Sequence, residues 1–210
     1  MIRVLVADDH SVIREGLRRI LEEHADLKVV AEAGSSDALI AALASSPADV
    51  LVLDISMPGP GVFALLERLK AEHPRLRSVV LTVHPADQYA VRVLRAGAAG
   101  FLSKEQSSDL LVDAIRKVFS GGVYLSPSLA DLLAADVASP RAGEPHEALS
   151  AREFEVLVRI ASGQSIKAIS AALSLSPKTV STYHSRIRKK LDLQSDAALT
   201  RYALEHRLTQ

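Results

Sequence analysis

The sequence predicts an α/β fold, a doubly wound five-stranded parallel sheet, followed by an all-α domain of four helices. Short apolar runs alternate with helical patterns over the first 120 residues, and this alternation implies parallel strands joined by right-handed crossovers. After residue 148 the apolar residues recur only at helical spacing. The length of 210 residues exceeds that of a typical small domain, which favours two domains.

The expected strands are short apolar runs that end at polar residues. The clearest is 50–53, four apolar residues in a row, which is typical of a strand buried on both faces. The five strands are expected over residues 2–7, 27–31, 50–53, 78–82 and 99–102. Helices are expected from Ser11, a plausible N-cap, over 36–44, around 65–69, over 87–96 and over 110–118.

Composition and charge restrict the possible functions. Cysteine is absent, which excludes disulfides, thiolate zinc sites and cysteine nucleophiles. No apolar run approaches the roughly 18 residues of a membrane span, and the first residues lead into a strand rather than a signal peptide. We therefore expect a cytoplasmic protein without membrane contact. Residues 150–210 carry ten Lys or Arg against five Asp or Glu, so only this part has the charge to meet nucleic acid.

Polar residues gather where the expected strands end. Asp8 and Asp9 follow the first strand, Asp54 follows the third, Thr82 ends the fourth and Lys104 follows the fifth. In a doubly wound sheet these strand ends meet in one crevice. Three carboxylates held together repel one another and require a cation, and oxygen ligands suit a hard ion such as Mg²⁺.

The same residues are suited to a phosphoryl group. A carboxylate beside Mg²⁺ can act as a nucleophile, so Asp54 can accept such a group. The Lys104 ammonium and the Thr82 hydroxyl would then stabilise its oxygens. Taken singly, each residue has a structural alternative: Asp54 as a turn cap, Lys104 as a solvated side chain, and Thr82 as a partner of the backbone.

These motifs resemble the receiver domain of two-component response regulators, a flavodoxin-like fold, over residues 1–120. The resemblance rests on Asp8-Asp9, Asp54 with Met57-Pro58, Thr82, Gly100-Phe101 and Lys104. It implies that Asp54 is the phosphate acceptor, that Lys104 contacts the phosphate, and that Thr82 and Phe101 are switch residues. It also implies a Mg²⁺ site made by Asp8, Asp9, Asp54 and the backbone carbonyl of Ser56.

The chain departs from the family pattern in two loops. Val62 stands where the family has a glycine, with Gly59 and Gly61 displaced ahead of it, which predicts a different loop shape. Lys104 precedes Glu105 rather than the usual proline, which follows a cis peptide in the family. Ser56 and His84 occupy positions that tune the lifetime of the phosphoryl group in relatives.

No enzyme motif accompanies the acidic cluster. A dehalogenase-like phosphatase needs a second acid two residues after the nucleophile, and here that position is Ser56. The sequence also lacks Gly-x-Ser-x-Gly and a Gly-rich phosphate loop. We therefore expect a protein that is not an enzyme.

Residues 121–148 are expected to link the two domains. Ser126-Pro127 opens a short helical stretch in which Leu129, Leu132 and Leu133 are apolar. Residues 137–148 contain prolines, a glycine and few large apolar groups, which is typical of a mobile tether.

The four C-terminal helices have clear boundaries. Ser150 with Glu153 fits a capping box, and the first helix ends at Ser162-Gly163. A short second helix precedes Ser176, which can cap a third helix that begins at Pro177 and carries Val180, Ile187 and Leu191 inward. A short turn before a basic, polar helix is typical of a helix-turn-helix, and the alternative is a solvated helix in a small bundle.

Residues 149–210 resemble the LuxR-type DNA-binding domain, so the whole chain resembles the NarL/FixJ subfamily of response regulators. The resemblance rests on Leu149-Ser150, Arg152-Glu153, Glu155-Val156-Leu157, Gly163, Ser176-Pro-Lys-Thr-Val180 and Lys190-Leu191. It implies that bases are read by Ser181, Thr182 and Ser185, and that phosphates are approached by Lys178, Thr179 and one or more of Arg186, Arg188 and Lys189. Serine makes weaker base contacts than Arg or Asn, so we expect affinity to depend on phosphates and dimerisation.

The resemblance implies a phosphorylation-controlled, DNA-binding transcriptional regulator. The implied partners are double-stranded promoter DNA, a sensor histidine kinase, RNA polymerase and a second copy of the chain, which pairs through residues 196–206 when phosphorylated or on DNA. The alternative is a receiver-fold interaction protein that never uses phosphate and binds DNA constitutively.

Overall fold

The structure is a computed structural model that describes residues 1–210 except 60, 84–85, 107, 127–128, 132–144 and 210. The chain divides into two compact units, residues 1–134 and 135–210. Four residues discussed above, His84, Pro127, Leu132 and Leu133, lie outside the described part.

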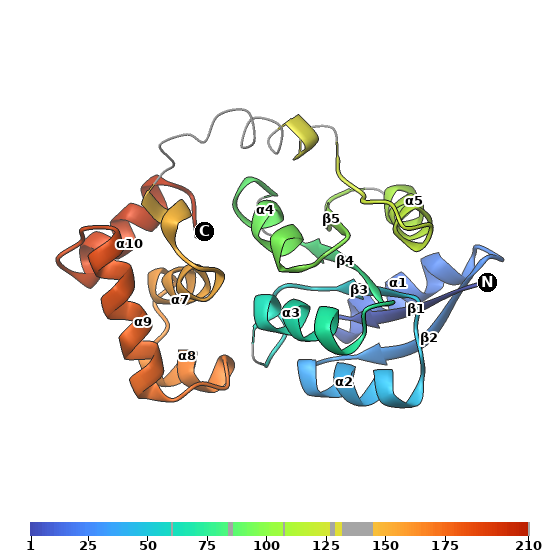
Figure 1. Ribbon diagram of the computed structural model, residues 1–210, viewed down its shortest axis with the longest axis horizontal. Coiled ribbons are helices and arrows are strands. Elements are labelled where there is room, and N and C mark those ends of the chain that lie inside the picture. The colour runs from blue at the N-terminus through green and yellow to red at the C-terminus, as the bar shows by residue number, and fades with distance from the viewer. Residues whose placement is uncertain (60, 84–85, 107, 127–128, 132–144, 210) are drawn as a thin grey trace. The chain divides into compact units, whose positions relative to one another are not determined.

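The first unit contains a five-stranded parallel sheet (Figure 1). Its strands are β1 (Ile2–Ala7), β2 (Leu27–Ala33), β3 (Val50–Leu53), β4 (Arg77–Thr82) and β5 (Gly100–Ser103). The spatial order is β2-β1-β3-β4-β5, and every neighbouring pair is parallel. The predicted α/β fold is confirmed, and β1, β3, β4 and β5 adjoin as the strand-end argument requires.

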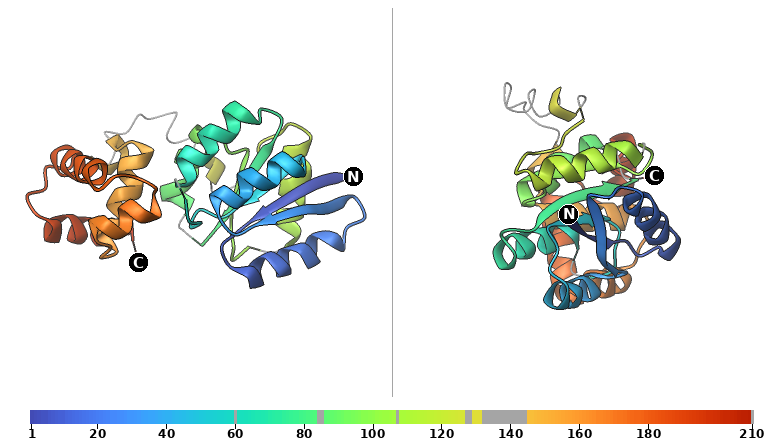
Figure 2. Two further views of the ribbon diagram at one scale, coloured as in Figure 1. Left: turned by 90° about the horizontal axis from the view of Figure 1, so that it is seen from below. Right: turned by 90° about the vertical axis from the view of Figure 1, so that its right-hand side faces the viewer.

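Helices cover both faces of this sheet (Figure 2). They are α1 (Ser11–Glu22), α2 (Ser36–Ser45), α3 (Val62–Glu72), α4 (Ala86–Ala96) and α5 (Ser108–Phe119). Val4, Val52 and Val79 pack with α1 and α5 in one buried cluster. On α3 and α4, the Phe63 and Tyr89 rings stack with centroids 6.4 Å apart.

Two local expectations were wrong. Ser11 is the first residue of α1 rather than its N-cap; the cap position is His10, whose side chain makes no capping hydrogen bond. The His10 N–H instead donates to the Asp8 carboxylate at 2.8 Å. Of the expected tether, residues 137–144 lie outside the described part, and the remainder, Pro145–Ala148, forms a 3-10 helix, η1.

The described part of the second unit, residues 145–209, is helical, as predicted. It contains η1, α7 (Ala151–Ala161), α8 (Ile166–Ala172), α9 (Pro177–Lys190) and α10 (Asp196–Glu205). The predicted capping box of Ser150 and Glu153 is present, and Ser176 caps α9 with Pro177 in its first turn. The core residues of these helices include Phe154, Leu157, Ile169, Leu173, Val180, Ile187 and Leu199.

Among the described residues, no helix has both the length and the apolar composition that a membrane span requires.

Candidate functional site

The carboxyl ends of three strands bring two acids and a lysine into contact. Asp8 follows β1, Asp54 follows β3 and Lys104 follows β5. The Lys104 Nζ lies 2.5 Å from Asp8 Oδ2 and 3.3 Å from Asp54 Oδ1. A single ammonium therefore bridges two carboxylates that lie 46 positions apart in the chain.

Burial makes it costly for the acids of this cluster to be ionised. Asp8 and Asp54 are only 1% and 4% exposed. Removal from water raises the pKa of the Asp54 carboxyl above its ordinary value; the Lys104 ammonium opposes this rise and the nearby Asp8 carboxylate adds to it. The Ser56 backbone also hydrogen-bonds to Asp54 and favours its ionised form. Asp54 is thus a desolvated carboxylate with limited charge compensation.

The donor set fits a divalent cation. Asp8, Asp9 and Asp54 carry three negative charges when ionised, and Lys104 balances only one of them. All three offer oxygen ligands, which Mg²⁺ prefers. Acidic pockets of this kind typically hold Mg²⁺ in receiver domains. Here the ligand atoms of Asp8 and Asp9 lie within 4.8 Å of each other, and Asp54 is linked to Asp8 through Lys104.

The sequence argument missed His10, which joins this cluster. Its Nδ1 lies 2.8 Å from Asp9 Oδ1 and 3.4 Å from Asp8 Oδ1. The ligand atoms of Asp8, Asp9 and His10 all lie within 4.8 Å of one another. The position of His10 directly after Asp8 and Asp9 could have indicated this contact. However, adjacent side chains after a strand do not ordinarily converge.

Thr82 and Phe101 lie in the interior of the same unit. Thr82 is fully buried, and its carbonyl accepts the Lys104 N–H at 2.8 Å. Phe101 is 2% exposed, within β5. Burial of both residues means that a change in either side chain requires neighbouring groups to move.

The loop after Asp54 contains two glycines with positive φ. Gly59 and Gly61 adopt φ of +137° and +84°, and a Cβ on Gly59 would lie 2.5 Å from Ser36 Oγ. The Pro58 carbonyl accepts the Ser36 N–H at 3.0 Å, which joins the loop to α2. The Lys104–Glu105 peptide is trans.

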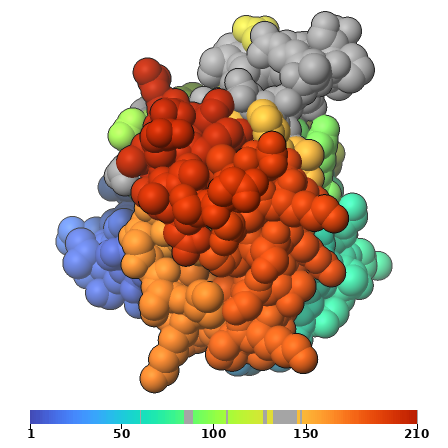
Figure 3. Space-filling view, turned by 90° about the vertical axis from the view of Figure 1, so that its left-hand side faces the viewer, coloured from blue at the N-terminus to red at the C-terminus, as the bar shows by residue number. Residues whose placement is uncertain are grey.

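In the second unit, α8 and α9 form the expected helix-turn-helix. Ser174 in the turn has φ of +53°, and the Leu175 N–H donates back to the Ser170 carbonyl at 2.9 Å. Six of the eight predicted DNA-contact residues are exposed on α9: Lys178, Ser181, Thr182, Ser185, Arg186 and Lys189. Side chains of α9 and α10 contribute to the face of this unit seen in Figure 3.

Thr179 and Arg188 differ from these six. Both are half-buried. The Thr179 hydroxyl lies 2.8 Å from the Ser176 hydroxyl. Arg188 donates to the carbonyls of Leu193 and Gln194, so its guanidinium holds the segment between α9 and α10. These backbone acceptors could not be predicted from the residue pattern, because the directions of the carbonyls depend on the fold.

Lys190, the last residue of α9, binds to groups at the start of α7. Lys190 Nζ lies 2.7 Å from Glu153 Oε2 and 3.1 Å from the Ala148 carbonyl. The same Glu153 oxygen accepts the Ser150 N–H at 2.8 Å. One carboxylate therefore completes the cap of α7 and positions the end of α9.

Two family models match the chain. The response regulator receiver domain matches residues 4–116, and the luxR family of bacterial regulatory proteins matches residues 147–203. The chain therefore belongs to the NarL/FixJ response regulators, which join a receiver to a LuxR-type helix-turn-helix.

Relatives match over nearly the whole length. The chain is 40% identical over 206 residues to the response regulator GacA of Pseudomonas protegens, covering 98% of this chain and 97% of that protein. It is 38% identical over 209 residues to the response regulator UvrY of Escherichia coli, covering 99% and 96%. Since the family is one of DNA-binding regulators, the chain is a two-component transcriptional regulator, and the alternative interaction protein is not favoured.

Solved structures agree with this assignment. The RcsB response regulator of Salmonella typhimurium matches with a TM-score of 0.78 and 30% identity, covering 97% of both chains. RcsB from Salmonella enterica serovar Typhimurium, bound to promoter rprA with the phosphomimetic BeF3-, matches with a TM-score of 0.73 at 30% identity, covering 96% of this chain and 97% of that one.

Proposed function

We propose that Asp54 accepts a phosphoryl group from a sensor histidine kinase and that this modification controls promoter binding. The observation that carries the proposal is the bridge from Lys104 Nζ to Asp8 and Asp54 at the strand ends. A carboxylate oxygen of Asp54 forms the new P–O bond while the P–N bond of the kinase phosphohistidine breaks.

Residues around Asp54 prepare this transfer. Lys104 can exchange its contact with Asp54 for one with a phosphoryl oxygen, because its ammonium already lies 3.3 Å from the acceptor carboxylate. Asp8, Asp9, Asp54 and the Ser56 carbonyl would hold Mg²⁺, whose charge would offset that of the phosphoryl oxygens. Thr82 and Phe101 would then move together as the switch.

The exposed face of α9 is the proposed DNA-reading surface. Lys178, Arg186 and Lys189 offer charges to phosphates, and Ser181, Thr182 and Ser185 offer hydroxyls to base edges. The hydroxyls of Ser181 and Thr182 donate to the carbonyls of Pro177 and Lys178, so they remain available as acceptors. Thr179 and Arg188 would act chiefly by shaping the ends of α9.

The proposed function implies several binding partners. The RcsB relatives are described as bound to promoter DNA and as dimers on DNA, and we propose promoter DNA and a homodimer through α10 for this chain. A histidine kinase as phosphodonor and RNA polymerase as the downstream partner complete the proposal. We further propose that the chain turns over no separate substrate and acts in the cytoplasm, as its family does.

Phosphorylation is tested by intact mass after incubation with acetyl phosphate and Mg²⁺. We expect one phosphoryl adduct on the wild type, none on Asp54→Ala, and one on the control Asp37→Asn, which changes an exposed acid of α2. An adduct that persists in Asp54→Ala would refute the acceptor assignment.

DNA reading is tested by footprinting and by affinity at several salt concentrations. Lys178→Ala should weaken binding uniformly across sequences and reduce the salt slope by about one. Thr182→Ala should relax base preference instead. Lys28→Ala, an exposed cation of β2, serves as the control; unchanged binding by both α9 variants would contradict the assigned surface.

A further inference from the structure

The segment after α5 extends the parallel sheet at the edge formed by β5. Tyr124 pairs in parallel with Gly100 of β5. The Tyr124 N–H donates to the Ala99 carbonyl at 2.9 Å, and the Tyr124 carbonyl accepts the Phe101 N–H at 3.4 Å. Because the pairing is parallel, residues 123–126 run toward the carboxyl end of β5, which is also the end that faces the proposed phosphorylation site.

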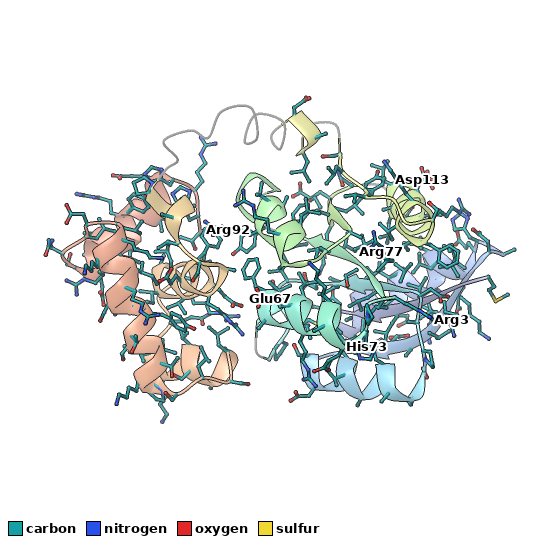
Figure 4. All side chains as sticks on the ribbon, in the orientation of Figure 1. Arg3, Glu67, His73, Arg77, Arg92 and Asp113 are labelled. Carbon is teal, nitrogen blue, oxygen red and sulfur yellow. The ribbon has the colours of Figure 1, made fainter. Side chains whose placement is uncertain are left out.

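Neighbouring residues hold Tyr124 in this position. Its side chain packs against the buried cluster of the sheet, and the Lys117 ammonium lies 5.8 Å from the centroid of its ring. Arg77, labelled in Figure 4, donates to the Gly122 carbonyl at 3.2 Å and so joins the preceding turn to β4. Gly100 allows the close approach, because a Cβ there would lie 3.3 Å from the Tyr124 Cβ. The contact is therefore supported by packing as well as by backbone hydrogen bonds.

This contact joins the proposed switch residue to the start of the linker. Phe101 lies in β5, and its N–H makes the longer, and thus the weaker, of the two bonds to Tyr124. Two residues after Tyr124, the Ser126 carbonyl accepts the N–H groups of Leu129 and Ala130 at 3.0 and 2.9 Å. A short, hydrogen-bonded stretch thus connects Phe101 to the segment that leads to the second unit.

We propose that Tyr124 is a positioning residue that couples Phe101 to this segment. When Phe101 moves after phosphorylation of Asp54, the backbone of Tyr124 follows β5, because two hydrogen bonds join them. The displacement then reaches Ser126 across one intervening residue, since consecutive Cα atoms lie a fixed distance apart. This coupling rests on the proposed function, because phosphorylation supplies the movement.

The test replaces single backbone donors with proline. Tyr124→Pro removes the N–H that binds the Ala99 carbonyl. Val123→Pro is the matched control, because successive N–H groups of an extended segment point to opposite sides, so that of Val123 points away from β5. Val123 is 47% exposed, so the loss of its side chain removes little packing.

The measured quantity is the factor by which acetyl phosphate and Mg²⁺ change the affinity of the full chain for promoter DNA that the wild type protects. Tyr124→Pro should bring this factor closer to one by about twofold or more, whereas Val123→Pro should keep it. Intact mass should show the Asp54 adduct in both variants, because Tyr124 acts on β5 rather than on the acceptor.

Three results would overturn the proposal. The first is a wild-type factor in Tyr124→Pro, and the second is an equal loss in Val123→Pro, which would assign the effect to the stiffness of proline. The third is loss of the adduct in Tyr124→Pro, which would place the effect at the acceptor.

Gly100→Ala tests the same contact from β5. Its added Cβ would press on the Tyr124 Cβ without removing a donor, and it should also bring the factor closer to one. If circular dichroism shows that Tyr124→Pro does not fold, Gly100→Ala decides, and a wild-type factor in that variant would overturn the coupling.

The wild type separates failure of the coupling from failure of the proposed function. If the wild type takes no adduct, the proposed function fails and the coupling fails with it. If the wild type takes the adduct and changes its DNA affinity, and Tyr124→Pro and Gly100→Ala respond equally, only the coupling fails.

Discussion

The buried Asp54 carboxylate, the proposed phosphate acceptor, lowers the stability of the fold when it is ionised. Its folded-state pKa is raised above the ordinary 3.8, chiefly by burial. The ionised carboxylate therefore destabilises the fold above pH 3.8, and this cost disappears as the pH falls below that value. A bound cation would offset the same cost near neutral pH.

We expect Asp54→Asn to stabilise the metal-free protein at pH 7 by about 1 kcal/mol. The amide keeps the shape of the side chain and removes the desolvated charge. Urea unfolding at pH 7 and at pH 3.5 measures this effect, and the gain should nearly vanish at the lower pH. Equal gains at both pH values would show that charge is not the cause.

Two arginines on α9, two residues apart, should have different roles. Arg186 is exposed, while Arg188 donates to the carbonyls of Leu193 and Gln194. We expect Arg186→Ala to weaken DNA binding without a change in stability. Arg188→Ala should destabilise the second unit by roughly 1 to 2 kcal/mol, as thermal unfolding would show. The reverse pattern would contradict this division.

At the scale of elements, the loop from β3 to α3 depends on Gly59. Its φ of +137° is unfavourable for other residues, and Ser36 leaves no space for a Cβ. Gly59→Ala should destabilise the first unit by about 1 to 3 kcal/mol. Gly16→Ala is the control, because an added Cβ there would meet nothing within 4 Å beyond the neighbouring backbone of α1, and it should be neutral or stabilising. Chemical denaturation compares the two, and equal effects would refute the steric explanation.

Strand bounds and helix caps were predictable from the sequence where residues close together in the chain determine them. Val50–Leu53 matches the prediction residue by residue, because a short apolar run between polar residues has few other solutions. Ser150 and Ser176 cap their helices as expected, since capping is decided within four residues. The convergence of Asp8, Asp54 and Lys104 followed from strand order alone.

The remaining features depend on contacts between distant or unexpected groups. β2 continues to Ala33 because Ala7 of β1 pairs with it, and the local pattern does not show that partner. The Ser11 cap was wrong because the Asp8 carboxylate receives the His10 N–H. The role of Arg188 depends on backbone carbonyls, whose directions the sequence does not reveal.

At the scale of the whole molecule, each unit has its own core, which predicts that the second folds alone. Residues 145–210 contain η1, all of α7 to α10 and the Lys190–Glu153 contact. We expect this fragment to fold and to protect the same DNA as the full chain, independently of acetyl phosphate. Circular dichroism and footprinting measure both properties. A fragment that is folded but protects different DNA would contradict the autonomy of this unit.

The Lys190–Glu153 contact also restricts where a fusion or truncation can be made in this protein. Because the end of α9 is anchored at the first turn of α7, a tag or fusion joined within residues 148–153 would disturb α9, the proposed DNA-reading helix, from a different element. Reporter fusions, truncations and domain exchanges should therefore place their junctions ahead of Pro145, where η1 begins. A junction only a few residues later would yield an impaired regulator whose own α9 sequence is unchanged.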